Sequence, residues 1–373
     1  MEILILNWKD VKNPQVGGAE VIAFEFAKRL VKDSHKVTFF SRSFPNCVKE
    51  ETLDGVKIIR RGNRLSVYLE AYLYYQSLKN KPDKVIDMIN TICWQTPSYV
   101  PKNNRIAYVN QLAKEVFFYE LPKPISYIAY LLEKFQYLTY KNTKFLCYSS
   151  STKNDLQQMG INAKNISIFT LGLDHERYKA IREKTNYPLF IYVGRLVRMK
   201  RVDLCIRSFN LVVNKYKNAV LAIVGNGSDE ERLVGISKKL RRSKNVIFVN
   251  KNNFFLKKHK KDLKIKLMQE AWGLLLPSVK EGLGMVVTEA AACGTLSIVS
   301  DVTGLRDSVI KNKTGLILSE KPSKKELSGA IIKIIEDVKL RNGLSKEAIR
   351  WAKNFDWDKS YREFKNLIIK NEK

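Results

Sequence analysis

Short apolar runs rich in β-branched residues alternate with segments of helical periodicity along the 373-residue chain. Buried parallel strands have this composition, and crossover helices connect them, so the alternation predicts an α/β fold with parallel sheets. The runs form two successive sets, the first from 2–6 to 166–171 and the second from 189–194 to 315–319. The sequence therefore predicts two doubly wound domains in tandem, each large enough to bury its own core.

The predicted boundary between the domains lies at residue 173, where Gly172 and a following polar stretch interrupt the periodicity. We assign residues 1–173 to an N-terminal acceptor domain and residues 174–350 to a C-terminal donor domain, with a last helix in 351–373 that crosses back to the N-terminal domain. Ligands of doubly wound sheets bind at the carboxyl ends of the strands. Two such domains facing one another predict a cleft between them.

The chain is strongly basic, with 66 Lys and Arg residues against 37 Asp and Glu residues and a formal net charge of +29. This excess indicates a polyanionic partner, which can be a nucleic acid, an anionic membrane or a phosphorylated substrate, although a compositional bias on solvated faces produces the same balance. The 5 cysteines are isolated, which favours a reducing compartment. With no apolar run long enough to span a bilayer, we expect a cytoplasmic protein, free or peripheral to the cytoplasmic face of a membrane.

Two loops that follow predicted strands can bind phosphate. Gly17 and Gly18 precede a helix, where backbone amides and the helix dipole attract an anion, although a tight turn requires the same residues. Gly194 opens a loop with four cations within seven residues, namely Arg195, Arg198, Lys200 and Arg201. Because arginine binds two oxygens in a planar fork and lysine adds a compact charge, this second loop is a candidate diphosphate clamp.

Two later loops complete a candidate nucleotide site. Gly225 and Asn226 follow a strand without the glycine spacing of a dinucleotide fingerprint, which favours a turn beside a flat base. Glu281 lies in a glycine loop after another strand, and Glu289 lies a little over one turn into the next helix. Carboxylates at this spacing suit the vicinal hydroxyls of a ribose and a hexose, although an acidic helix N-terminus explains either one alone. The loop amides that can bind phosphate or sugar oxygens belong to Gly282, Leu283, Gly284, Met285 and Val286.

Taken in order, these segments resemble the family-4 retaining glycosyltransferases of GT-B architecture over nearly the whole chain. The matching elements are Gly17-Gly18-Ala19-Glu20, Ser149-Ser150-Ser151-Thr152 to Leu156, Gly172-Leu173-Asp174, Gly194-Arg195 with Lys200, Val224-Gly225-Asn226-Gly227, and Pro277-Ser278 followed by Glu281 and Glu289. The resemblance implies two Rossmann-like domains and the transfer of a hexosyl group from a nucleotide-diphosphate sugar to an acceptor hydroxyl. The nucleotide sugar is then a co-substrate, and neither a cofactor nor a metal ion is expected.

The resemblance also implies a role for each matched residue. Arg195 and Lys200 would neutralise the donor diphosphate and stabilise the leaving group, and Glu281 would hold hydroxyls of the donor sugar, so these three are the predicted catalytic residues. Glu289 would bind the ribose hydroxyls. The predicted donor-binding residues are completed by Gly17, Gly18, Gly194, Gly225, Asn226 and the amides of residues 282–286.

Asn110 departs from the family pattern. The family often has a histidine at this position, after the fifth strand, that reaches the donor sugar. An asparagine can still hydrogen-bond a sugar or acceptor hydroxyl, but it cannot titrate, so a proton-transfer role at this position is not expected.

Most of the basic surplus lies outside the candidate donor site. Residues 232–266 contain 13 basic residues and 1 acidic residue, and anionic lipid attracts surface cations by about 1 kcal/mol each. Tyrosines crowd two predicted helices of the N-terminal domain, and tyrosine suits either a headgroup interface or a core; we expect at least half of these in the core. The expected partners are a nucleotide-sugar donor, a lipid-linked or glycan acceptor and an anionic membrane surface, in glycan, glycolipid or cell-surface polysaccharide synthesis.

Three alternatives stay open on the sequence. The same transfer can act on a soluble acceptor, with the basic segment a compositional accident, and the fold also suits an epimerase or a phosphorylase. A nucleic-acid-binding protein is the third alternative. It is not favoured because no binding module is recognisable and Phe248, Phe254 and Phe255 fit strand and loop core better than a stacking platform. Nucleic acid is therefore not an expected partner.

Overall fold

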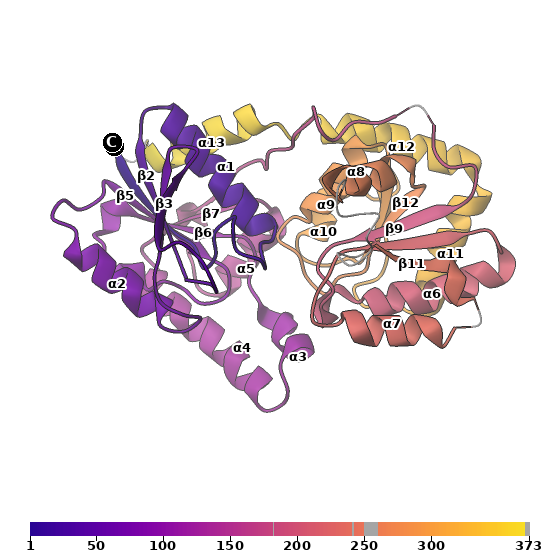
Figure 1. The fold of residues 1–373 in the computed structure, drawn as a ribbon, viewed down its shortest axis with the longest axis horizontal. Helices are drawn as coiled ribbons and strands as arrows, with labels where there is room; N and C mark the ends of the chain where they lie inside the picture. Colours follow the sequence, from indigo (N-terminus) through magenta and orange to yellow (C-terminus); the bar gives the residue numbers. More distant parts are fainter. Residues whose placement is uncertain (182, 241, 250–259, 370–373) are drawn as a thin grey trace. The chain divides into compact units, whose positions relative to one another are not determined.

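The computed structural model describes residues 1–181, 183–240, 242–249 and 260–369. The chain forms two compact units (Figure 1). Unit 1 consists of Met1–Lys114, Tyr127–Thr170 and Asp358–Lys373, and unit 2 consists of Glu115–Ser126 and Leu171–Trp357. Each unit is built on its own, largely parallel sheet with helices packed on it, which confirms the predicted architecture of two α/β domains.

Unit 1 contains an eight-stranded sheet with the order β3-β4-β2-β1-β5-β6-β7-β8. Its neighbouring strands pair in parallel except for β3 with β4, which are antiparallel. The strands are β1 (Glu2–Leu6), β2 (Lys36–Ser41), β3 (Glu50–Leu53), β4 (Val56–Arg60), β5 (Lys84–Ile89), β6 (Arg105–Val109), β7 (Lys144–Cys147) and β8 (Ile166–Ile168). The helices are α1 (Gly18–Lys32), α2 (Val67–Ser77), α5 (Ser150–Gln158) and most of α4 (Ile125–Gln136) and α13 (Trp357–Ile369).

Aromatic packing fixes the last helix, α13, to unit 1. The ring of Phe364 stacks on that of Phe26 from α1 at a centroid distance of 4.3 Å, and the Tyr361 hydroxyl donates to Oδ2 of Asp33 at 2.7 Å. The predicted terminal segment 351–373 is therefore divided, since its first seven residues belong to unit 2.

Unit 2 contains a six-stranded parallel sheet, in its described residues, with the order β11-β10-β9-β12-β13-β14. The strands are β9 (Leu189–Val193), β10 (Val220–Val224), β11 (Val246–Val249), β12 (Gly273–Leu276), β13 (Leu296–Val299) and β14 (Gly315–Ile317). The helices are α3 (Phe117–Glu120), α6 (Val202–Lys215), α7 (Glu230–Lys238), α8 (Lys260–Glu270), α9 (Met285–Ala292), α10 (Leu305–Ser308), α11 (Lys324–Glu336) and α12 (Val338–Ala352). The strand order reverses between β9 and β12, and this is the point at which doubly wound sheets bind ligands.

The largest difference between the predicted domains and the observed units lies within the predicted N-terminal domain. Residues 115–126 fall inside the predicted N-terminal domain, yet they belong to unit 2. Two polar contacts hold this segment to unit 2. Oε1 of Glu120 accepts the backbone N–H of Met199 at 2.8 Å, and Oε2 of Glu115 lies 3.4 Å from Nζ of Lys280. The main passage between the units follows Thr170, three residues before the predicted boundary.

Candidate active site

The loops after β9 and β10 form one hydrogen-bonded layer at the carboxyl edge of the unit 2 sheet. The N–H of Gly194 donates to the carbonyl of Val224 at 3.0 Å, and the N–H of Leu196 donates to the carbonyl of Asn226 at 2.9 Å. The N–H of Asp229 returns to the carbonyl of Leu196, also at 2.9 Å. The structure thus brings together three of the predicted donor-binding residues, Gly194, Gly225 and Asn226.

Two glycines permit this close approach of the loops. A Cβ atom on Gly225 would lie 1.9 Å from the carbonyl oxygen of Gly194, and a Cβ atom on Gly227 would lie 2.1 Å from the carbonyl oxygen of Leu196. No side chain can occupy either space without separating the loops, because these contacts involve backbone atoms. The glycines are therefore required by loop packing, whatever else they contact.

Lys200 and Glu281, which are 81 residues apart in sequence, form an ion pair between Nζ and Oε1. Lys200 ends the 3₁₀ turn η6 (Arg198–Lys200), and Glu281 lies between β12 and α9. Ser278 donates through Oγ to the same carboxylate oxygen at 2.8 Å, and the N–H of Val279 donates to the carbonyl of Met199 at 2.8 Å. The predicted diphosphate lysine and the predicted sugar carboxylate are therefore in direct contact.

The other cations of the predicted clamp are placed differently. Arg195 and Arg198 are exposed. The backbone carbonyl of Arg195 accepts the hydroxyl of Tyr192 at 2.8 Å, and burial keeps the pKa of Tyr192 far above its ordinary value, so this hydroxyl stays a donor. Arg201 is directed to the carbonyl of Pro322 at 3.1 Å. The four cations are thus divided between the surface, the pair with Glu281 and a structural contact.

Glu289, the predicted ribose ligand, is buried and already holds a cation. Its Oε2 lies 2.5 Å from Nζ of Lys264, and the same ammonium donates to the hydroxyl of Tyr178 at 3.2 Å. Burial lowers the pKa of Lys264, but the charge of Glu289 and the contact with Tyr178 outweigh it and leave the pKa raised. Burial and Glu289 raise the pKa of Tyr178 to about 12. Neither Lys264 nor Tyr178 was predicted as a site residue, since no local sequence pattern marks either of them.

The N-terminal turn of α9 contains the remaining predicted amides, those of residues 282–286. Gly284 caps the helix in the left-handed region, at φ 69°, which favours glycine. The carbonyls of Glu281 and Gly282 lie so close to Gly304 that a Cβ there would approach them to 2.3 and 2.6 Å. The turn is therefore packed tightly at the positive end of a helix dipole, an arrangement that suits a phosphate or a sugar oxygen.

In unit 1, the Gly17 and Gly18 loop connects β1 with α1. The N–H of Gly17 donates to Oε2 of Glu20 at 2.6 Å, as in a capping box, and Glu20 is buried beside Lys9. The carboxylate of Glu20 thus engages the amide that we expected to contact phosphate at Gly17. The predicted phosphate contact then rests on the amide of Gly18, the first residue of α1.

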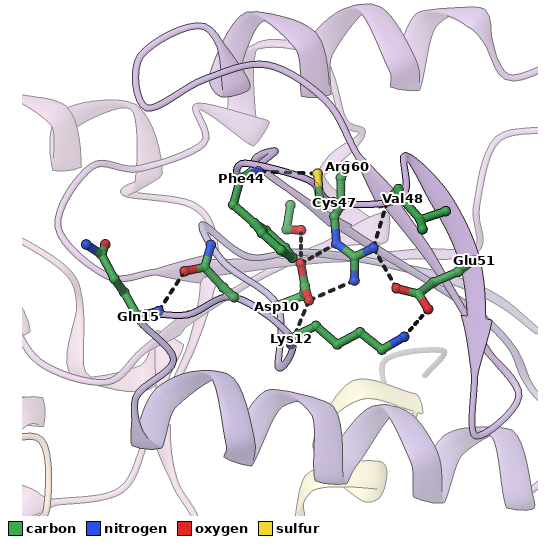
Figure 2. Close-up of polar contacts among 10 residues, drawn as sticks. Asp10, Lys12, Gln15, Phe44, Cys47, Val48, Glu51 and Arg60 are labelled. Carbon is green, nitrogen blue, oxygen red and sulfur yellow. Dashed lines mark hydrogen bonds and ion pairs between the residues drawn. The ribbon is translucent and has the colours of Figure 1, made fainter. Parts of the chain in front are cut away.

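A buried ion cluster holds the start of the same loop (Figure 2). The guanidinium of Arg60 donates through Nε and Nη2 to the two oxygens of Asp10 at 2.7 and 2.9 Å, and through Nη1 to Glu51 at 2.6 Å. The exposed fractions are 1% for Arg60 and 0% for Asp10. Asp10 also accepts the N–H of Lys12 at 2.8 Å and the hydroxyl of Ser41 at 3.0 Å. This cluster was not predicted, and its one signal in the sequence is an arginine at the end of the apolar strand 56–60.

Asn110 lies in a row of hydrogen-bonded side chains at the carboxyl ends of four neighbouring strands. Nδ2 of Asn110 donates to Asn90 at 3.2 Å, and Nδ2 of Asn90 donates to Asn7 at 2.8 Å. The hydroxyl of Tyr148 donates to Oδ1 of Asn110 at 3.2 Å. These residues follow β1, β5, β6 and β7. The predicted sugar or acceptor contact is therefore part of a polar edge that includes three residues sequence analysis did not select.

Family models now connect this geometry to known proteins. The model of the glycosyl transferases group 1 matches residues 174–351, and that of glycosyltransferase family 4 matches residues 16–177. The chain belongs to glycosyltransferase family 4. The family resemblance drawn from the ordered motifs is thereby confirmed.

Individual relatives agree with this assignment. The family-4 chain is 30% identical over 230 residues to a glycosyltransferase of Methanocaldococcus jannaschii, covering 60% of this chain and 59% of the relative. It is 26% identical over 238 residues to the capsular polysaccharide biosynthesis glycosyltransferase CapM of Staphylococcus aureus, covering 61% and 60%. These matches therefore span about three fifths of the relatives' lengths.

Solved structures establish the fold of the family-4 chain as GT-B. The sucrose-phosphate synthase of Thermosynechococcus elongatus matches with a TM-score of 0.81 at 19% identity, covering 98% of both chains. Anabaena HepE, solved in complex with UDP-glucose, matches with a TM-score of 0.74 at 16% identity, covering 99% of both chains. At these identities, the similarity concerns the fold.

Proposed function

We propose that this protein is a retaining glycosyltransferase that moves a sugar from a nucleotide-diphosphate sugar to an acceptor hydroxyl in polysaccharide or glycoconjugate synthesis. The observation that carries the proposal is the contact of Lys200 with Glu281 at the carboxyl ends of β9 and β12. Doubly wound sheets bind nucleotides where the strand order reverses, as it does there. Family membership supports the reaction class, and a fold relative binds UDP-glucose.

In this proposal Lys200 and Glu281 have different tasks. The ammonium of Lys200 has three donors, so it can bind a diphosphate oxygen while it keeps its contact with Glu281. Ser278 and Lys200 both hold Oε1 of Glu281, which leaves Oε2 for a hydroxyl of the donor sugar. The exposed guanidinium of Arg195 supplies a second cation for the diphosphate.

The reaction we propose retains the anomeric configuration. The bond from the anomeric carbon to the diphosphate oxygen breaks, and the acceptor oxygen bonds to the same face of that carbon. The acceptor proton passes to an oxygen of the leaving diphosphate. Negative charge develops on the leaving group, so Lys200, Arg195 and the N-terminal turn of α9 stabilise the transition state more than the ground state. No metal ion or further cofactor takes part in this proposal.

Glu289 is proposed to bind the ribose. Lys264 holds its Oε2, so Oε1 is the atom offered to the two vicinal hydroxyls. Lys264 belongs to the basic segment 232–266 that we assigned to a membrane surface. Within that segment, Arg232 also has a partner in unit 2, since its Nε lies 2.6 Å from Oδ1 of Asp229. Arg241 and residues 250–259 lie outside the described residues, as do Phe254 and Phe255.

The acceptor is proposed to be a lipid-linked or glycan hydroxyl presented at the cytoplasmic face of a membrane. The relative CapM acts in capsular polysaccharide biosynthesis, and the net charge of +29 suits an anionic surface. No helix among the described residues is long and apolar enough to cross a membrane.

Substitution at the ion pair tests the proposed function. Lys200→Ala and Glu281→Gln are each expected to reduce kcat/KM for sugar transfer at least about a hundredfold, since each removes a charged contact to the donor. The measurement is release of nucleoside diphosphate from a panel of nucleotide sugars, with and without a glycan acceptor. Lys215→Ala is the matched control, because Lys215 also pairs with a glutamate, Glu336, but on the surface.

Two outcomes would contradict the proposal. Full sugar transfer by Lys200→Ala would show that Lys200 does not bind the donor. Turnover of the sugar nucleotide without an acceptor and without release of nucleoside diphosphate would indicate an epimerase.

A further inference from the structure

Helix α4 turns the polar side chains of Ser126, Glu133 and Gln136 inward. Ser126 and Glu133 are 0% and 2% exposed. The two oxygens of Glu133 accept the backbone N–H groups of Ala113 and Lys114 at 2.6 and 2.7 Å. One turn later, the side-chain amide of Gln136 accepts a backbone N–H and donates to a backbone carbonyl of loop 91–93, both at 2.8 Å. Hydrogen bonds to the backbone therefore hold much of the inner face of α4.

The apolar side chains of α4 and of the turn after it point outward instead. Their exposed fractions range from 49% to 60% for Ile128, Leu131, Leu132, Phe135 and Leu138. A helix on the surface of a water-soluble domain normally has the reverse arrangement, with its apolar stripe against the core. A contiguous row of exposed leucine, isoleucine and phenylalanine marks an interaction surface. Figure 1 shows α4 along the lower edge of unit 1.

Helix α2 adds further exposed apolar side chains near the same loop. Leu69 and Leu73 of the helix are 60% and 49% exposed, and Leu65, two residues before it, is 77% exposed. The helix contacts Trp94, the residue that follows loop 91–93, through Tyr68, and the two ring centroids lie 4.9 Å apart. Thus two helices that pack on residues 91–94 both present leucines to the outside.

The tyrosines of these helices divide between the core and the surface. Tyr74 and Tyr75 of α2 and Tyr137 and Tyr140 after α4 are buried, whereas Tyr72, Tyr127 and Tyr130 are exposed. The sequence pattern alone could not make this division. Exposed tyrosines beside exposed leucines are typical of a surface that meets lipid headgroups.

The charges around α4 indicate which kind of partner its apolar face can bind. Residues 121–144 contain four lysines and a single acidic residue, Glu133, which is buried. Lys134 and Lys141 are exposed at the end of the apolar row. Within residues 121–144, cations border the apolar face and the one carboxylate is buried, an arrangement that is complementary to anionic headgroups that overlie acyl chains. At 12 residues, the helix is far too short to span a bilayer and suits a position parallel to its surface.

We propose that the outward face of α4 inserts into the headgroup region of an anionic lipid bilayer. This face would hold the enzyme at the membrane on which the proposed sugar transfer takes place, so the biological role of the contact rests on the proposed function. The binding itself depends on α4 alone and not on the donor site.

Co-sedimentation of the full chain with lipid vesicles tests the proposal. The vesicles consist of phosphatidylcholine alone or of phosphatidylcholine with phosphatidylglycerol, and binding is expected to the second. The triple variant Leu131→Ser, Leu132→Ser and Phe135→Ser is expected to bind at least about tenfold more weakly. The matched control replaces exposed valines outside α4, Val48→Ser with Val338→Ser, and is expected to bind as the unaltered chain does.

The single variant Leu132→Lys separates insertion from attraction by charge alone. If the basic segment 232–266 holds the protein on the lipid by charge, this variant binds as well as or better than the unaltered chain, and the proposal is overturned. If α4 inserts, it binds more weakly despite the added cation. Unaltered binding of the triple variant, or no binding of the unaltered chain, also overturns the proposal.

Two further measurements complete the test. A dimer that the triple variant dissociates, seen by sedimentation velocity, would assign the α4 face to a second copy of the chain and refute a lipid partner. Calorimetry with UDP on the triple variant reports the donor site separately. For the triple variant, retained UDP binding with lost vesicle binding is the expected combination. For the unaltered chain, vesicle binding without any sugar transfer would count against the proposed function alone.

Discussion

Replacing Asp10 with asparagine is expected to destabilise unit 1 strongly while leaving unit 2 unchanged. Asp10 and Arg60 are fully buried and share two hydrogen bonds of 2.7 and 2.9 Å. An asparagine keeps one oxygen acceptor, but its amide group then faces donors of Arg60 and Ser41. The guanidinium retains Glu51 and the carbonyl of Val48, at 2.6 and 2.7 Å, so its charge stays partly compensated.

The magnitude follows from these contacts. Removing one partner of a buried ion pair costs about 3–5 kcal/mol, and the retained contact with Glu51 favours the lower end. A domain of about 150–250 residues loses about 2–4 °C in Tm per kcal/mol, so we expect a decrease of about 6–12 °C. The matched control is Glu2→Gln, which breaks an exposed pair with Lys36 and should cost below about 1 kcal/mol.

The effect of Asp10→Asn should also depend on pH with a defined sign. Burial raises the pKa of Asp10, but hydrogen bonds from Arg60, Lys12 and Ser41 and the charge of Arg60 outweigh it and leave the pKa lowered. A carboxylate with a lowered pKa stabilises the fold above its ordinary pKa of about 3.9, and this stabilisation is lost as pH falls through the folded-state pKa. The difference between the unaltered chain and the variant should therefore be constant from about pH 5 to 8 and shrink below about pH 4.

Differential scanning calorimetry with and without a nucleoside diphosphate is the assay. Nucleotide bound to unit 2 should raise the transition of that unit and so identify it. The reasoning is refuted if Asp10→Asn lowers the unit 1 transition by less than about 2 °C, or if it lowers the transition that nucleotide raises.

Two further predictions concern Asp87 and Gly227. Burial raises the pKa of Asp87 to about 6 despite hydrogen bonds from Tyr140 and Thr96, so stability should fall by about 2–3 kcal/mol as pH rises from about 4 to 6. Denaturant unfolding at several pH values should show this decrease in the free energy of unfolding, and Asp87→Asn should abolish it. An unchanged decrease in the variant would assign the pH dependence to another group. Gly227→Ala should weaken nucleoside diphosphate binding in calorimetry at least about tenfold, since its Cβ would displace the carbonyl of Leu196. Gly235→Ala, with open space around its Cβ, is the control and should bind normally.

The sequence by itself determined the two α/β domains and most loops of the candidate site. Strand and helix periodicities are local, and glycines mark turns and close approaches without reference to distant residues. Parallel strands also direct their carboxyl ends to one edge. The sequence alone therefore predicts that the Gly194, Gly225 and Glu281 loops lie at the same edge.

Only the tertiary structure decided which charges meet. Lys200 meets Glu281 across 81 residues, and Arg60 meets Asp10 across 50. Sequence spacing carries no information on such pairs, because burial and the geometry of several strands together decide which partners a buried charge finds. The same limit explains why Lys264 seemed part of a surface segment although it holds Glu289.

The orientation of α4 was decided in the same way. Its apolar periodicity predicts a helix, and the usual rule would turn its leucines inward. In the folded chain, Glu133 accepts the backbone N–H groups of Ala113 and Lys114, and leaving buried backbone groups unpaired is costly. The polar side of α4 therefore faces inward and its leucines face outward, a result that depends on where residues 113 and 114 lie in three dimensions.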